Sequence, residues 1–137
     1  MRTHRRRYAW LGLLPALVVS LPAAAAEDIE TIVGEWEQIA SNAGACPTCR
    51  ITFETRGKSF TVTANNGWAA TLSDIRATEL SGAGEWDASV RGWPTGHAFT
   101  IHFRREGNRL QMTMTVDTGS ADRPIVTGIF RRPWQGV

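Results

Sequence analysis

This sequence has few of the residues that build catalytic or metal centres. Only two of its 137 residues are cysteine and three are histidine, whereas a structural zinc site needs four such ligands. It contains no G-x-S-x-G, H-E-x-x-H or glycine-rich phosphate-binding motif. Glu85 and Asp87 share the polar face of one expected strand, which favours solvation over the acid–base chemistry of a carboxylate pair. We therefore expect no enzyme activity, no catalytic residues, no metal and no cofactor.

The long apolar run of this sequence lies in the first part of the chain, after a cluster of basic residues. Four arginines among residues 1–7 precede an apolar run over about 8–21, and Ala24 and Ala26 fit the small-residue rule for a cleavage site. The run is shorter than the roughly 20 residues that a membrane span needs. The sequence thus predicts a signal peptide over 1–26, a periplasmic or secreted protein, and no membrane span after cleavage.

Removing this leader reverses the sign of the net charge. The whole chain carries +2, but residues 27–137 hold eleven Lys+Arg against thirteen Asp+Glu, which leaves −2. The remaining arginines are scattered, and a nucleic-acid-binding protein would show a clustered basic face. We therefore expect no nucleic-acid partner. The absence of linkers and repeats indicates one domain over 27–137, with a single modest core.

Apolar and polar residues alternate along most of residues 34–132, with the period of half-buried antiparallel strands. In residues 98–104, for example, Phe99, Ile101 and Phe103 share one face. The segments with this pattern, or expected to extend the sheet at either end, are 34–41, 49–55, 58–64, 68–73, 80–88, 98–104, 109–117 and 123–132. Only residues 27–33 are typical of a helix, of about two turns.

Short glycine-containing turns join several of these strands, as expected for hairpins. Closing such a meander into a barrel removes its exposed edges. We therefore predict an all-β fold, a small antiparallel up-and-down barrel of about eight strands with a short N-terminal helix after the signal peptide. A barrel of this size holds either side chains or one small ligand.

Two features at the ends of this meander resemble the calycin superfamily of lipocalins, fatty-acid-binding proteins and avidins. Gly34 and Trp36 form a Gly-x-Trp at the start of the first strand, and Arg131 and Arg132 close the last. The resemblance implies a lipocalin-like barrel in which Trp36 plugs one end and Arg131 or Arg132 packs over its ring, as a cation–π contact. It also implies the binding of a small molecule, although the ligand residues of avidins have no match here.

The candidate ligand-binding residues lie on two neighbouring strands. Leu80, Gly82, Gly84 and Trp86 share one face, which we expect to point inward together with Trp68. The glycines have two explanations, because they either relieve the curvature of the barrel or leave a slot for a planar or apolar guest beside the two indoles. We favour the slot, since dense interiors rarely place glycine at inward positions.

The cysteines, Cys46 and Cys49, stand directly before a strand-like segment. In an oxidising compartment two thiols this close tend to form a disulfide. A thioredoxin-like centre needs a helix after the motif, and a strand follows here. We favour a structural disulfide, with a redox centre and a metal site as alternatives.

Three functions fit these features. The first is a binding module that holds a small apolar or aromatic ligand in the barrel, and we expect a tryptophan-lined hollow for it. The alternative is a periplasmic protein-interaction module, a protease inhibitor or an accessory subunit, for which we expect a filled barrel and an exposed apolar patch near residues 91–98. The third, less favoured, is a redox or metal factor that uses Cys46 and Cys49.

Overall fold

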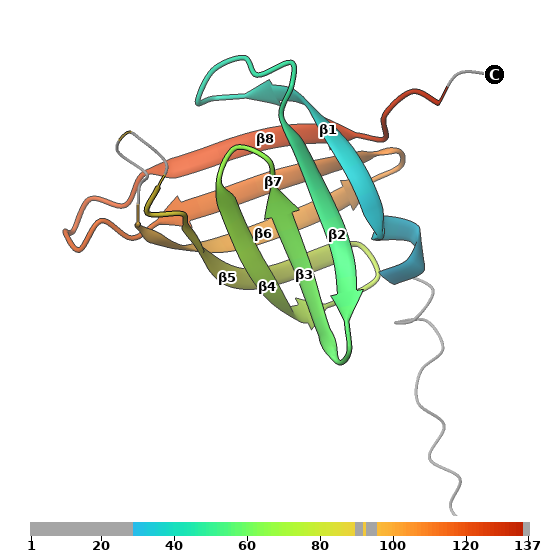
Figure 1. The fold of residues 1–137 in the computed structure, drawn as a ribbon, viewed down its shortest axis with the longest axis horizontal. Coiled ribbons are helices and arrows are strands. Elements are labelled where there is room, and N and C mark those ends of the chain that lie inside the picture. Colours follow the sequence, from blue (N-terminus) through green and yellow to red (C-terminus); the bar gives the residue numbers. More distant parts are fainter. Residues whose placement is uncertain (1–28, 90–91, 93–95, 136–137) are drawn as a thin grey trace, which may run out of the picture.

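The computed structural model describes residues 29–89, 92 and 96–135, and shows a closed antiparallel barrel in which each strand pairs with the next (Figure 1). The strands are β1 (Gly34–Ser41), β2 (Arg50–Arg56), β3 (Ser59–Ala64), β4 (Trp68–Ile75), β5 (Glu79–Trp86), β6 (Ala98–Glu106), β7 (Arg109–Val116) and β8 (Ile125–Arg131). Pairing of β1 with β8 closes the sheet. The predicted all-β up-and-down barrel of eight strands is confirmed.

A short helix over residues 29–32 precedes β1. This part of the prediction is confirmed, although the described helix is only one turn long, because the chain enters β1 at Gly34 with a positive φ of 106°. The predicted signal peptide at 1–26 lies outside the described residues. The described ranges contain no helix with the length and apolar character of a transmembrane segment.

The direction of the strands separates the barrel into two ends. One end carries the short helix, the start of β1 and the residue after β8, and we call it the helix end. The β1–β2, β3–β4 and β7–β8 loops, at 42–49, 65–67 and 117–124, meet at the other end, called the loop end. Figure 1 shows the helix beside the start of β1 and the long β1–β2 loop at the far end of that strand.

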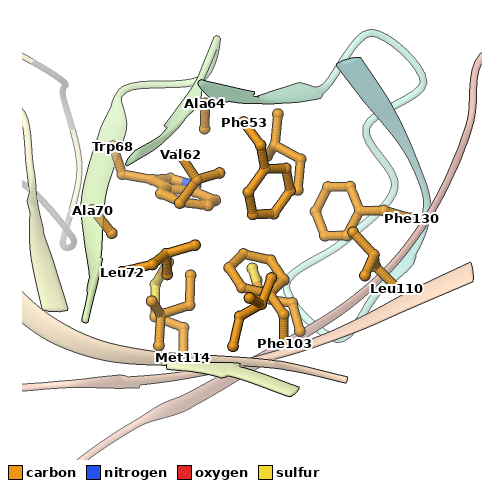
Figure 2. Packing of buried hydrophobic residues seen from close by; sticks show 14 of the residues in the cluster. Phe53, Val62, Ala64, Trp68, Ala70, Leu72, Phe103, Leu110, Met114 and Phe130 are labelled. Atoms are coloured by element: carbon orange, nitrogen blue, oxygen red, sulfur yellow. The ribbon is translucent and has the colours of Figure 1, made fainter. Parts of the chain in front are cut away.

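The alternating residues of the strands form one apolar core. In β6 the burial alternates residue by residue, with Phe99, Ile101 and Phe103 buried. Figure 2 shows side chains of several strands converging inside the barrel, where the Phe53 and Phe103 rings meet edge to face with centroids 5.1 Å apart. Among the described residues no polar or charged side chain is buried. The core therefore depends on apolar packing, which is the main driving force of folding.

Trp36 closes the helix end of the barrel. Its side chain is 1% exposed, and its indole Nε1 donates to the carbonyl oxygen of Ile32 at 2.9 Å. The guanidinium carbon of Arg132 lies 4.2 Å from the centre of the Trp36 ring, within the range of a cation–π contact. Gly34 leaves room for that guanidinium, since a Cβ there would lie 3.1 Å from Nη1 of Arg132.

Arg132 also joins the short helix to β1. Its guanidinium donates to the carbonyl oxygens of Thr31, Val33 and Glu35, at 2.7, 3.0 and 3.2 Å. Burial lowers the pKa of Arg132, and the positive charge of Arg105 lowers it further. Arg131 points to the other side of β8 and donates to Glu37 at 2.7 Å. Of the two arginines that the resemblance left open, Arg132 is therefore the one over the ring.

Gly82 and Gly84 lie where the backbone of β5 comes very close to that of β4. A Cβ on Gly82 would collide with the Thr71 carbonyl and lie 2.8 Å from the Cα of Leu72. A Cβ on Gly84 would collide in the same way with the Ala69 carbonyl. Glycine is required at such a close backbone approach. The structure thus gives both glycines a reason in the close approach of two backbones, independent of a ligand.

Candidate functional site: a cavity at the loop end

A cavity of about 310 Å³ opens inside the loop end of the barrel. It is lined by Gln38, Ser41, Ala43, Gly44, Ala45, Cys46, Cys49, Arg50, Ile51, Asn66, Trp68, Trp86, Met112, Met114, Val126 and Phe130. Its volume is at the small end of the range of about 300–1,000 Å³ that ligand pockets span. The barrel is therefore filled toward the helix end and hollow toward the loop end.

Two tryptophans from neighbouring strands form one wall of the cavity. Trp68 of β4 pairs in register with Trp86 of β5, so that both side chains point to the inner face. Their rings meet edge to face, with centroids 6.5 Å apart and an interplanar angle of 61°. The Phe99 ring meets the Trp68 ring edge to face, with the two centroids 5.7 Å apart. This packing holds the indole of Trp68, which is 5% exposed, in one orientation.

Methionine and aliphatic side chains from β7 and β8 form another wall. Met112 and Met114 of β7 and Val126 and Phe130 of β8 all line the cavity. Met114 pairs in register with Val126, and Met112 with Gly128. A side chain at Gly128 would contact Phe130 at 2.9 Å, so this glycine makes space for the phenylalanine ring. Thioether sulfurs beside aromatic rings give an apolar and polarisable lining.

The indole nitrogen of Trp86 has no hydrogen-bond acceptor among the described residues. Its Nε1 is buried, and no described residue accepts a hydrogen bond from it. A buried donor left unsatisfied costs about 1–3 kcal/mol, and each such group in a folded protein calls for an explanation. Trp86 also lines the cavity, although its Nε1 has almost no solvent-accessible surface.

A β-bulge brings two polar residues of β1 to the cavity. The pairing of β1 with β8 shifts between Gln38 and Ala40, which places one extra residue in β1. Gln38 and Ser41 both line the cavity as a result, while Ala40 is exposed. Simple alternation would put Gln38 and Ser41 on opposite faces, so the sequence pattern did not reveal this pair. Asn66, in the β3–β4 turn, is a further lining residue that the sequence reasoning missed.

Among the described residues, Arg50 is the only charged residue that lines the cavity, and it is already paired. It forms ion pairs with Glu35 at 3.5 Å and with Glu37 at 3.3 Å. Its guanidinium also donates to the carbonyl oxygens of Pro47 and Cys49, both at 3.2 Å. By contrast, no hydrogen bond joins the side-chain amide of Gln38 or of Asn66 to another described residue. The described lining thus offers free hydrogen-bonding groups but no free charge.

The β1–β2 loop at the mouth of the cavity is closed by a disulfide. Cys46 and Cys49 are bonded, with their Cα atoms 5.3 Å apart, which confirms the predicted pairing. Asn42 ties the start of the loop to β8, since it accepts from Thr127 N at 2.8 Å and donates to Ile125 O at 2.9 Å. Asn65 holds the end of the loop beside the β3–β4 turn, since its side chain accepts from Arg50 N and donates to the carbonyl oxygen of Thr48, both at 2.8 Å.

We expect Cys46 and Cys49 to be oxidised in the exported protein, and the barrel to survive their reduction. Cys49 follows Cys46 by three positions. A disulfide that closes so short a loop stabilises the protein by only about 2 kcal/mol. A thiol assay on freshly isolated protein tests the first expectation, and two free thiols would contradict it. Circular dichroism of the reduced protein, with the Cys46→Ser/Cys49→Ser variant as control, tests the second, which fails if the strand signal is lost.

The predicted site residues are only partly brought together. Trp68 and Trp86 line the cavity, whereas Gly82 and Gly84 do not. No group of three or more His, Cys, Asp or Glu side chains suited to a metal ion occurs among the described residues. Half of the predicted interaction patch at 91–98, residues 91 and 93–95, lies outside the described residues. The exposed large apolar side chains elsewhere are Val33, Ile125 and Trp134, on three different segments.

The closed barrel of eight antiparallel strands is consistent with a calycin-like small barrel. Comparison of the chain with protein-family models, with curated proteins and with solved structures finds no match.

Proposed function

We propose that this protein is a lipocalin-like binding module, rather than an enzyme, that holds a small apolar or aromatic ligand at the loop end of its barrel. The observation that carries the proposal is the tryptophan-lined cavity of about 310 Å³. Dense packing is the norm in protein interiors, and voids larger than a water molecule are few. A hollow of this size beside two ordered indoles is the feature that we expected of a ligand carrier.

The proposal extends to an exported protein in an oxidising compartment. The Cys46–Cys49 disulfide is compatible with such a compartment, and the leader-like residues 1–26 are the sequence signal for export. In this setting the disulfide has a structural role, since it shapes the loop at the mouth of the cavity. A small ligand would bury its apolar surface against the partly exposed Trp86 and Val126, at about 25 cal/mol per Å².

We expect an apolar fluorescent probe to bind saturably and to quench tryptophan emission. Val126→Phe should weaken this binding at least tenfold, because Val126 lines the cavity and a larger ring there would occupy the space of the guest. The matched control is Thr127→Phe, which adds a ring at the next residue of β8, on the exposed face. A fluorescence titration of the three proteins measures the effect.

Two results would contradict the proposal. The first is a wild-type protein that shows no saturable binding, in which case the protein-interaction module takes the place of the ligand carrier. The second is a folded Val126→Phe variant that binds as tightly as the wild type, because the probe would then lie outside the cavity. Near-ultraviolet circular dichroism of both variants establishes that they are folded.

A further inference from the structure

We propose that the ligand of this cavity is a neutral, planar molecule with one polar edge. In the bound state its flat body lies beside Trp86 and Val126, two partly exposed apolar residues of the lining, and its polar edge meets Gln38 and Asn66. This inference rests on the proposed binding function and specifies its ligand class. Three properties of the lining support it: its charge, the shape and chemistry of its walls, and the position of its unpaired polar groups.

The charge of the lining argues for a neutral ligand. Arg50 is the only charged residue among the described ones that line the cavity, and its guanidinium is held by Glu35, Glu37 and two carbonyl oxygens. An anionic ligand would have to compete with both carboxylates for this group. A cationic ligand would find no carboxylate in the described lining. Because an unpaired charge is costly to bury, the cavity selects against both.

The walls argue for a planar body. The Trp68 and Trp86 rings, at 61° to each other, present flat apolar surfaces, and aromatic guests stack on such rings or meet them edge to face. The lining also includes four sulfur-containing residues, Met112, Met114 and the bonded Cys46 and Cys49, of which Cys46 is the most exposed. Contacts between thioether sulfur and the edge of an aromatic ring are favourable. A flexible aliphatic chain would gain neither kind of contact.

The unpaired polar groups argue for a polar edge. The side-chain amides of Gln38 and Asn66 line the cavity without a hydrogen bond to any other described residue. Each amide offers both donors and an acceptor. A purely hydrocarbon ligand would leave these groups unmatched, whereas a hydroxyl or carbonyl on the ring would match one or two of them.

Isothermal titration calorimetry with three bicyclic probes of similar size tests the inference. The probes are naphthalene, which has no polar group, 2-naphthol, which is neutral at pH 7, and 2-naphthoate, which is an anion. We expect 2-naphthol to bind about fivefold to tenfold more tightly than naphthalene and at least tenfold more tightly than 2-naphthoate. In the Gln38→Leu/Asn66→Leu variant the advantage of 2-naphthol over naphthalene should disappear, while the affinity for naphthalene changes less than twofold.

Gln111→Leu serves as the matched control, because Gln111 is exposed on β7 and the same substitution there should preserve the order of the three probes. Binding of 2-naphthoate as tight as that of 2-naphthol would overturn the inference and leave the proposed function standing. A preference for 2-naphthol that survives in the double variant would also overturn it. If none of the probes binds to the wild type, the proposed function itself fails.

Discussion

Replacing Trp36 with alanine is expected to lower the free energy of unfolding by about 3–5 kcal/mol, as large-to-small changes of a buried aromatic residue do. Trp36 is 1% exposed, so the substitution leaves a cavity at the helix end of the barrel. It also removes the hydrogen bond to Ile32 O and the ring beneath the Arg132 guanidinium. The short helix, β1 and the residue after β8 lose a common contact.

Chemical denaturation measures this effect, and Trp134→Ala is the matched control. Trp134 is 83% exposed, and a surface substitution of this kind usually changes stability by no more than about 0.5 kcal/mol. Arg132→Lys should lie between the two, at about 1–2 kcal/mol, because one ammonium group does not reproduce a planar guanidinium that serves three carbonyls. If the Trp36→Ala variant unfolded at the same denaturant concentration as the wild type, Trp36 would not be the plug of the barrel.

The second large effect is expected at the paired glycines of β5. Gly82→Ala combined with Gly84→Ala should destabilise the protein by more than about 3 kcal/mol or prevent folding, because both added methyl groups collide with the backbone of β4. Overpacking of a core typically costs about 1–3 kcal/mol. The cost here should be at the upper end or beyond, since a strand backbone cannot move aside as a flexible side chain does.

Ala83→Val is the matched control for this pair. Ala83 lies between the two glycines on the exposed face of β5, and valine is well suited to a strand. We expect this variant to be at least as stable as the wild type. Thermal unfolding followed by circular dichroism compares the three proteins. If the double alanine variant melted within about 2 °C of the wild type, the close approach of β4 and β5 would not require glycine.

The pattern of residues along the chain was enough to predict the class of fold and most of the inward-facing residues. The reason is local, because alternation with a period of two assigns each residue to one face of its strand. Phe99, Ile101 and Phe103 are all buried as this alternation predicts. The close spacing of Cys46 and Cys49 along the chain likewise indicated the disulfide that joins them.

The tertiary structure alone decided which residues gather at the cavity. Which side chains of different strands meet depends on bulges and on the closure of the barrel, and the alternation within one strand does not reveal either of these. The bulge in β1 turns Gln38 and Ser41 toward the same cavity, and the closure of the barrel places Arg132, not Arg131, over Trp36. The close approach of β4 to β5 gave Gly82 and Gly84 a structural reason that their spacing did not reveal. Alternation orients a side chain relative to its own strand, whereas a site is formed by the contacts between strands.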